Sequence, residues 1–389
     1  MSDDIHPFHI AIPDPDVEDL HERLSRTRRP NALPGVGWER GVPADYLEQL
    51  LAYWRDDYDW RAHERQLNAF AQYVTTIDGQ PIHFLHVRSP EPDALPLLVT
   101  HGYPSSVVEF THVIGPLSDP RAHGGDPADA FHLVLPSVPG FGFSSPLREP
   151  GWQLARTARA WVELMRRLGY ERYVAQGGDI GAGVTGMLGA LEPQAVLATH
   201  VNSDPLGTAL IADRLGIDLE AFAASGLSED DRQRVEFLAR YAAEGKGYLQ
   251  LQSTRPQGIA YALTDSPVAQ LVWIAEKFKE WTDPEAELPE DAVDRDQLLT
   301  NVSLYWFTRT GASAANFLYE AAHSSEWLAP SGTPQGWAVF ATDAIMRRLL
   351  DPEQQIEHWS QFERGGHFAA MEAPDLLVED VRAYFRRFR

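Results

Sequence analysis

The stretch Gly177-Gly178-Asp179-Ile180-Gly181 decides the fold prediction. It directly follows the apolar run Tyr173 to Ala175 and precedes a helical run that starts at Ala182. A Gly-x-nucleophile-x-Gly turn between a strand and a helix presents its central residue at the top of a sheet, because glycines permit the strained turn and the close approach of the helix. The pattern is also compatible with a Gly-rich turn whose Asp begins a helix, so the surrounding sequence has to decide.

Short apolar runs on both sides of this turn are typical of buried parallel strands. They are Leu95 to Thr100, Phe131 to Leu135, Tyr173 to Ala175 and Leu197 to Val201. Apolar residues between the later runs recur at helical spacing, most clearly at Leu154, Ala158, Trp161, Val162, Met165 and Leu168. Strands that alternate with helices predict an α/β protein whose parallel sheet is covered on both sides.

The two ends of this region have different patterns. The segment Pro43 to Trp54 has one apolar face at helical spacing, which predicts a helical arm before the sheet. A hairpin from Phe70 to Val87 follows, with Asp78-Gly79 as its turn. A long stretch after the fourth apolar run is helical and rich in Trp and Tyr, which predicts an inserted helical cap. The predicted divisions are an arm at 1–68, a first core segment at 69–204, a cap at 205–328 and a second core segment at 329–389.

Composition narrows the class of protein. The 33 basic and 56 acidic residues give a net charge of -23, which repels nucleic acid and anionic membrane surfaces. The absence of cysteine excludes disulfides, thiol nucleophiles and thiolate metal sites. No signal peptide or apolar run long enough to span a bilayer is evident, so a soluble cytoplasmic protein is expected. Whether it forms a homodimer stays open.

Further motifs fit an α/β-hydrolase fold around the Asp179 turn. His101-Gly102-Tyr103-Pro104 follows the strand that ends at Thr100, where this fold supplies an N–H group of its oxyanion hole. The backbone N–H groups of Tyr103 and Ile180 are therefore the expected pair. His101 lies too early in the chain to be the base, and is expected to brace the loop.

His367 is the expected base. It lies in Arg364-Gly365-Gly366-His367-Phe368, and the fold places nucleophile, acid and histidine in that chain order. The acid stays open at this point between Asp343, after the strand Trp337 to Phe340, and Asp204, after the strand Leu197 to Val201. Either could instead cap a helix or a turn.

An Asp nucleophile changes the reaction class. Attack by a carboxylate on an ester would form an anhydride, which disfavours esterase chemistry. Attack on an sp³ carbon that bears an epoxide oxygen or a halide gives an alkyl ester of Asp179. His367 then deprotonates water, and the oxyanion hole stabilises the charge formed when that water attacks the ester carbonyl.

With these motifs in place, the chain resembles the microsomal-type epoxide hydrolases and their bacterial relatives over nearly its whole length. The motifs that carry the resemblance are Trp60-Arg61, Thr76 to Gly79, His101 to Pro104 through Glu109-Phe110, Pro139 to Ser144, Gly177 to Gly181, Asp265 to Pro267 and Gly365 to Ala370 through Glu372. The resemblance implies an α/β-hydrolase core, an N-terminal helical arm and a helical cap, with no metal or cofactor. It favours Asp343 over Asp204 as the acid, and it implies two cap tyrosines that donate hydrogen bonds to the epoxide oxygen. One of them falls on Tyr248.

Four positions depart from the family pattern. Family members usually carry Trp at Tyr103, Trp at Ile180 and Pro at Ala341. The second cap tyrosine is replaced by Leu318, and the adjacent Tyr319 is the candidate second donor although one helical residue turns a side chain by about 100°. The chain is most similar to actinobacterial members, some of which act on large epoxides in enediyne-type antibiotic pathways.

Two other functions stay open. A haloalkane-type dehalogenase shares the Asp nucleophile, but usually carries Trp after it for halide binding, where this chain has Ile180. A catalytically silent binding protein of the same fold is the second alternative, disfavoured by the presence of Asp179, His367 and Asp343. The size of the substrate cannot be predicted, because Trp273, Trp281, Trp306 and Phe307 fit either a pocket or the core of the cap.

Overall fold

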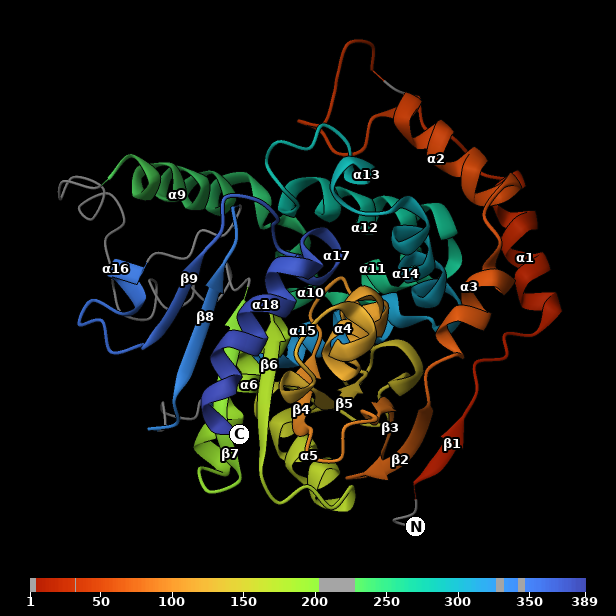
Figure 1. The fold of residues 1–389 in the computed structure, drawn as a ribbon. Helices are drawn as coiled ribbons and strands as arrows, with labels where there is room; N and C mark the ends of the chain where they lie inside the picture. The colour runs from red at the N-terminus through yellow and green to blue at the C-terminus, as the bar shows by residue number, and fades with distance from the viewer. Residues whose placement is uncertain (1–4, 32, 203–227, 327–331, 342–346) are drawn as a thin grey trace.

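The computed structural model describes residues 5–31, 33–202, 228–326, 332–341 and 347–389. Within these ranges one sheet has the strand order β1-β2-β3-β5-β4-β6-β7-β8-β9 (Figure 1). The strands β1 to β3 and β5 are joined by antiparallel pairs, and the pairs from β5 through β4 to β9 are parallel. The bounds are β1 His6–Phe8, β2 Gln72–Ile77, β3 Gln80–Val87, β4 Leu95–Thr100, β5 Phe131–Pro136, β6 Tyr173–Gly178, β7 Val196–Asn202, β8 Gln335–Val339 and β9 His358–Gln361.

Helices cover both faces of the sheet. The helices α5 (Leu154–Arg167) and α6 (Ile180–Leu191) pack together on one face, and α4 (Thr111–Ser118) and α18 (Pro374–Phe385) pack together on the other. Side chains of β4 alternate between these layers, since Leu98 joins one buried cluster while Leu97 and Val99 join the other. The shorter helices are η1 Val107–Phe110, η2 Pro120–His123, η3 Pro127–Asp129, η4 Gly142–Ser144, α16 Arg347–Leu350, α17 Ala369–Glu372 and η6 Arg386–Phe388.

The insertion between β7 and β8 is helical where it is described. Its elements are α9 Glu229–Arg240, the π-helical turn η5 Tyr241–Gly245, α10 Gly247–Thr254, α11 Pro256–Asp265, α12 Pro267–Trp281, α13 Pro289–Ala292, α14 Arg295–Thr308 and α15 Thr310–His323. Its α14 contacts the loop after β4 directly, because Asn301 Nδ2 donates to the Pro104 carbonyl over 2.8 Å and the Tyr305 hydroxyl donates to the Ser105 carbonyl over 2.8 Å.

The N-terminal arm consists of α1 (Asp14–Ser25), α2 (Ala44–Asp56) and α3 (Trp60–Leu67). Figure 1 shows these red and orange helices along the outer side of the cap. The Trp54 indole donates to Ser303 Oγ at 3.0 Å, and Tyr58 and Thr300 share a hydrogen bond of 2.9 Å. The apolar face predicted for the arm is therefore buried against α14 of the cap.

Two strands were not expected from the sequence. β1 precedes the helices of the arm and pairs with β2, with His6 opposite Val74. β9 lies in the sequence between Phe340 and the His367 turn, and it pairs with β8. Both are short edge strands. Three or four residues carry too little alternation to reveal a strand before its partner is known.

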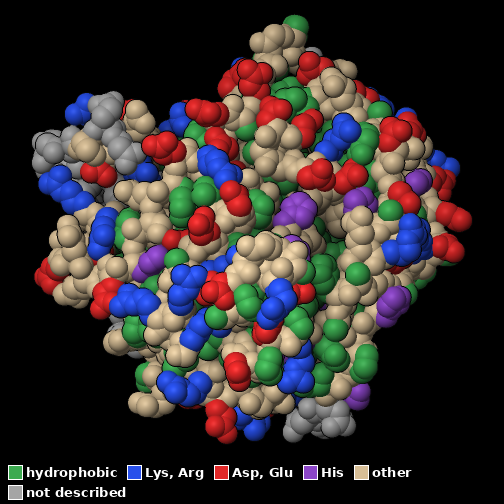
Figure 2. Space-filling view, viewed as in Figure 1, with side chains coloured by type: hydrophobic (Ala, Val, Ile, Leu, Met, Phe, Trp, Pro, Cys, Tyr) green, Lys and Arg blue, Asp and Glu red, His purple; other side chains and the backbone are tan. Residues whose placement is uncertain are grey.

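The surface has mixed charge. Figure 2 shows acidic and basic side chains interspersed over this face of the molecule. Among the described helices, none combines the length and the apolar character needed to cross a bilayer.

Candidate active site

The Asp179 turn has the strained geometry that its glycines suggested. Asp179 stands between β6 and α6 with φ 55° and ψ -120°, a conformation that L-residues rarely adopt. The fold permits it because α6 comes very close to β4: a Cβ atom at Gly181 would lie 1.9 Å from the Thr100 carbonyl oxygen. Only glycine fits there, and the carboxylate is thereby fixed at the end of β6.

The loop after β4 meets this carboxylate because β4 and β6 are neighbours in register, with Thr100 opposite Gly177. The Tyr103 backbone N–H donates to Asp179 Oδ1 over 2.9 Å. Ile180 is the first residue of α6, so its N–H has no acceptor within the helix. The two N–H groups expected to form an oxyanion hole therefore come from segments that meet at Asp179.

His101 supports that loop. Its Nε2 accepts the Val138 backbone N–H over 3.1 Å, so Nδ1 carries the proton and bonds the Gly102 carbonyl at 3.0 Å. Burial lowers the pKa of His101 to about 4, and the ring stays neutral. These contacts are those of a bracing histidine.

His367 faces the same carboxylate from the other side. Its Nε2 lies 3.6 Å from Asp179 Oδ2, which is too long for a hydrogen bond. Its backbone N–H donates to the Trp281 carbonyl over 2.8 Å, and the ring lies 4.9 Å from the Trp281 ring. Burial lowers the pKa of His367, although the negative charge of Asp179 acts in the opposite direction. The imidazole is therefore neutral near pH 7 and able to accept a proton.

Both candidate acids, Asp343 and Asp204, lie outside the described residues. Nearby contacts nevertheless bear on them. The Ala341 backbone N–H donates to the Gly365 carbonyl over 3.1 Å, which joins the chain after β8 to the His367 loop. Within the described ranges, the buried Nδ1 atom of His367 has no hydrogen-bond partner.

Tyr248 lies over the site from the cap. Its ring is parallel to that of Tyr103 with centroids 6.0 Å apart, and it makes an edge contact of 5.4 Å with Trp281. The Lys277 ammonium lies 4.8 Å from the centre of the Tyr248 ring. Burial, with smaller contributions from neighbouring groups that include Asp179, raises the pKa of Tyr248 well above its usual value. The phenol thus remains a proton donor.

Tyr319 has different surroundings. It is half-buried, and its ring stacks on that of His323 at 4.1 Å. Its neighbour Leu318 is buried in the same apolar cluster as Tyr248. The contacts that place Tyr248 beside Asp179 have no counterpart at Tyr319 among the described interactions.

Comparison with known proteins supplies the family. Residues 5–110 match the model described as "Epoxide hydrolase N terminus", and residues 96–223 match "alpha/beta hydrolase fold". A protein of Stigmatella aurantiaca (strain DW4/3-1) is 44% identical over 388 residues, which are 99% of this chain and 86% of the relative. Epoxide hydrolase 1 of Oryctolagus cuniculus is 33% identical, over 97% of this chain and 88% of its own. Both are named as epoxide hydrolases.

The chain belongs to the epoxide hydrolase family. Solved structures agree. The epoxide hydrolase of Aspergillus niger has a TM-score of 0.82 at 28% identity, covering 99% of this chain and 96% of that one. The juvenile hormone epoxide hydrolase of Bombyx mori has a TM-score of 0.81 at 29% identity, covering 100% and 95%. The predictions of an α/β-hydrolase fold and of an epoxide hydrolase enzyme are confirmed.

Two residues of this epoxide hydrolase site were missed as candidates. Glu109 is buried, and burial, with a smaller contribution from the Asp179 charge, raises its pKa to about 7. The Tyr241 hydroxyl lies 3.2 Å from that of Tyr248. The sequence motif that ends in Glu109-Phe110 did not indicate a role for Glu109 itself. The one sequence signal for Tyr241 was its spacing of seven residues from Tyr248.

The four aromatic residues that fitted either a pocket or the core of the cap separate into two pairs. Trp281 touches His367, and the Trp273 indole donates to the Tyr103 hydroxyl over 2.5 Å. Trp306 lies beneath the Arg23 guanidinium, and Phe307 packs on Trp60 of the arm. Only the first pair borders the Asp179 site.

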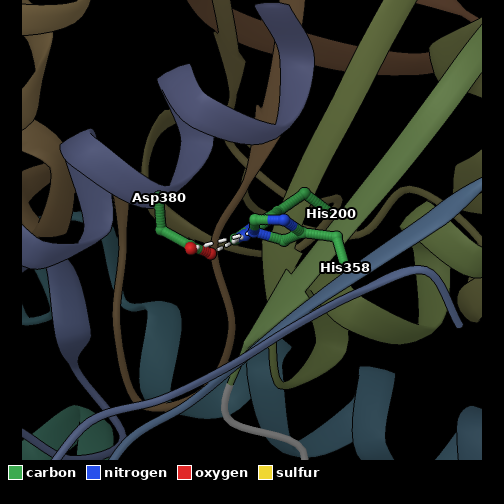
Figure 3. A group of neighbouring side chains, drawn as sticks. All are labelled: His200, His358 and Asp380. Carbon is green, nitrogen blue, oxygen red and sulfur yellow. Dashed lines mark hydrogen bonds and ion pairs between the residues drawn. The ribbon is translucent and has the colours of Figure 1, made fainter. Parts of the chain in front are cut away.

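Among the described residues, a group of side chains that could bind a metal consists of His200, His358 and Asp380, whose possible ligand atoms lie within 4.8 Å of one another. Figure 3 shows both imidazoles turned toward the Asp380 carboxylate, with Nε2–Oδ distances of 2.8 and 2.9 Å. A carboxylate accepts only, so each Nε2 carries its proton. Metal-bound histidines normally donate the other N–H to a partner, whereas the buried Nδ1 of His200 has none among the described residues. The cluster is better explained as a brace between β7, β9 and α18.

Proposed function

We propose that this chain converts an epoxide to a vicinal diol through a covalent ester on Asp179. The observation that carries the proposal is the Asp179 carboxylate, which a strained backbone presents at the end of β6. It accepts the Tyr103 N–H on Oδ1 while Oδ2 faces the neutral His367. A nucleophile, an oxyanion donor and a base are thus arranged around one carboxyl group.

In the first half-reaction, Asp179 Oδ2 attacks an epoxide carbon. A bond forms between Oδ2 and that carbon, and the electron pair of the broken C–O bond passes to the epoxide oxygen. Tyr248 donates its hydroxyl proton to this oxygen as charge develops, because the buried phenol is still protonated at neutral pH. Oδ1 keeps its hydrogen bond to Tyr103 and becomes the ester carbonyl oxygen.

In the second half-reaction, His367 accepts a proton from a water molecule that attacks the ester carbonyl carbon. Negative charge then develops on Oδ1, where the Tyr103 N–H already donates and the Ile180 N–H is nearby. Collapse of this intermediate breaks the acyl C–Oδ2 bond. The departing alkoxide takes the proton of His367, and the proton left on the new Asp179 carboxyl returns the Tyr248 phenolate to a phenol.

Asp343 is the acid that we assign to His367 Nδ1. In the sequence, Ala341 lies two residues before Asp343 and Gly365 lies two residues before His367. The hydrogen bond between Ala341 and Gly365 supports the assignment. A carboxylate acceptor at Nδ1 would keep Nε2 free for the proton of water. The buried Nδ1, which has no partner among the described residues, supports that assignment.

The alternative reactions are disfavoured by the residues around Asp179. Ile180 has no N–H in its side chain and cannot bind a departing halide as an indole would. The catalytically silent alternative leaves the strain at Asp179 unexplained, since such strain persists where function requires it. Chloride release from a chloroalkane, without diol formation from epoxides, would favour the dehalogenase.

A single turnover in ¹⁸O-labelled water tests the covalent mechanism. With enzyme in excess, the first diol should contain no label, because its new oxygen comes from Asp179, and the label should appear in the peptide that contains Asp179. The His367→Gln variant is a matched probe, since it should accumulate the ester as a mass increase equal to the substrate. Label in the first diol would contradict the ester mechanism.

Substrate size and pathway are also proposals. We assign the chain to epoxides of secondary metabolism, of the enediyne antibiotic type, on the strength of its sequence resemblance alone. A panel that compares propylene oxide, styrene oxide and a polycyclic aryl epoxide tests this. Higher kcat/KM for the polycyclic substrate is the expected result, and a preference for the smallest epoxide would contradict it.

A further inference from the structure

Two phenol groups meet in the cap, directly over the site. Tyr241 of η5 and Tyr248 of α10 are 8% and 5% exposed, and their hydroxyl oxygens lie 3.2 Å apart. Buried hydroxyls commonly bond backbone or a charged partner, whereas these two bond each other. One hydrogen bond between two hydroxyls leaves the second O–H free to donate to another acceptor.

The local backbone explains how they meet. Residues seven apart in a straight α-helix share a face but lie about 10.5 Å apart along the axis. Here the five residues from Tyr241 to Gly245 form a π-helical turn, a feature often found at functional sites. Gly245 makes room for the ring, because a Cβ atom there would lie 2.5 Å from Tyr241 Cδ2. The turn and its glycine together hold the Tyr241 hydroxyl against Tyr248.

Both phenols are within the electrostatic influence of the nucleophile. Burial is the main cause that raises the pKa of Tyr241 to about 12, and the charge of Asp179 contributes in the same direction. The same charge raises the pKa of Tyr248, whose ring lies parallel to Tyr103. The contacts place the pair: Tyr248 packs on Tyr103, whose backbone N–H donates to Asp179 Oδ1, and on Trp281, which contacts His367. The two phenols therefore lie on the cap side of the Asp179 carboxylate, where the epoxide oxygen would be placed during attack.

We propose that Tyr241 is the second hydrogen-bond donor to the epoxide oxygen, acting beside Tyr248. This proposal rests on the epoxide chemistry proposed above and assigns a residue within it. Leu318 is apolar and buried, and the Tyr319 ring is stacked on His323, so α15 offers no comparable phenol among its described contacts.

Two donors can share the charge that develops on one oxygen. With an epoxide bound, the two phenols exchange their mutual hydrogen bond for the epoxide oxygen, which accepts both O–H groups. As Asp179 Oδ2 bonds to carbon and the epoxide C–O bond breaks, the electron pair moves to that oxygen. Tyr248 transfers its proton to form the alcohol, and the Tyr241 O–H then donates to the Tyr248 phenolate 3.2 Å away. The second proton of the hydrolytic water later restores that phenolate.

The rate of ester formation tests the assignment. In a His367→Gln background, where the ester accumulates, we expect Tyr241→Phe to slow alkylation of Asp179 by about 10²-fold, as loss of an oxyanion-type donor does. Tyr319→Phe is the matched control, and its rate should stay within about threefold of the parent. The ring is kept in both variants, and the melting temperature of Tyr241→Phe should remain close to that of the parent.

A second readout separates proton donation from packing. The alkoxide formed from trifluoromethyl oxirane is less basic than that from propylene oxide, so it needs a donor less. The loss in Tyr241→Phe should therefore be smaller with trifluoromethyl oxirane, whereas a packing defect would lower both rates equally. Equal losses, an unchanged rate in Tyr241→Phe, or a severe loss in Tyr319→Phe would each overturn the proposal. If the parent itself forms no Asp179 ester, the proposed function fails instead.

Discussion

The Ala341 backbone N–H donates to the Gly365 carbonyl over 3.1 Å, and this bond joins the end of β8 to the loop that carries His367. It brings together two segments that are separated in the sequence by β9. Asp179 and His367, the proposed nucleophile and base, lie within the described residues, and Ala341 precedes Asp343, the proposed acid, by two residues in the sequence.

Asp343→Asn should slow hydrolysis of the ester intermediate by about 10⁴-fold, because an amide at this position holds the wrong histidine tautomer. Alkylation of Asp179 should proceed nearly unchanged, so the ester accumulates. Rapid-quench mass spectrometry of the Asp179 peptide measures both steps.

Asp204→Asn is the control for that assignment, since Asp204 follows β7 as Asp343 follows β8. Its deacylation rate should remain within about threefold of the parent. The reverse ranking of the two variants would move the acid to Asp204.

Tyr248→Phe should lower the alkylation rate by about 10³-fold, at the upper end of the effect of losing one oxyanion-type donor. The Tyr248 ring is held by packing on Tyr103 and on Trp281, beside Asp179, the proposed nucleophile. The measurement is the rate of ester formation in a single turnover. Retention of more than a tenth of the parent rate, about 1.4 kcal/mol in barrier, would show that Tyr248 is not the principal donor.

The sequence was sufficient to predict the Asp179 turn because the requirements of that turn are local. Gly181 must accommodate the Thr100 carbonyl, and Asp179 must tolerate a positive φ, and both constraints are visible as a short motif. The apolar face of the arm was predictable for the same reason, since helical periodicity is written in consecutive residues.

What could not be predicted depends on partners that are distant in sequence. β1 is a strand only because β2 lies beside it. The pKa of Glu109 is raised because the fold buries its carboxyl group and brings it under the influence of the Asp179 charge. Tyr241 was missed because a regular helix would separate residues seven apart by about 10.5 Å along its axis, whereas here a π-helical turn lies between them and the two hydroxyls meet. On α15, Leu318 is buried and Tyr319 is half-buried, which agrees with the rotation of about 100° between neighbouring residues of a helix.

Gly181→Ala should abolish soluble expression or lower stability severely. A Cβ atom at that position would lie 1.9 Å from the Thr100 carbonyl oxygen, and β4 cannot move without breaking its pairs with β5 and β6. Gly186→Ala, on the same helix, is the matched control because nothing lies within 4 Å of its added Cβ. It should stabilise by about 0.5–1 kcal/mol through helix propensity. Urea denaturation of both variants checks the contrast.

Asp380→Asn should lower stability at pH 7 by about 1.5–3 kcal/mol, the usual contribution of hydrogen bonds to a charged group. Burial would raise the pKa of Asp380, but hydrogen bonds from His200, His358 and Ser360 outweigh burial and lower it. A lowered carboxyl pKa stabilises the fold above the unfolded pKa near 4, and that contribution is lost as the pH falls through the folded value. The deficit of the variant should therefore shrink below about pH 4.

The exposed Glu357 provides the comparison for Asp380. Its ion pair with Arg387 lies at the surface, so Glu357→Gln should change stability by no more than about 1 kcal/mol at any pH. Denaturant titrations from acid to neutral pH measure both variants. A deficit in Asp380→Asn that is independent of pH would show that packing, rather than charge, makes the brace stabilising.

Glu109→Gln should stabilise the protein above neutral pH. Burial is the main cause that raises the pKa of Glu109 from 4.5 to about 7, and the charge of Asp179 adds to it. Between these two pH values the folded state binds a proton that the unfolded state has released. Stability therefore falls as the pH rises through this window, by about 3 kcal/mol in total for a shift of this size.

The glutamine side chain keeps the shape of the protonated acid and cannot ionise, so the variant should lack that slope. Its stability should match that of the parent near pH 4.5 and exceed it above pH 7, as measured by urea denaturation across the range. Because protonated Glu109 and glutamine are both neutral, alkylation below pH 7 should change by less than about threefold. Parallel pH profiles for parent and variant would show that Glu109 is already ionised in the folded protein.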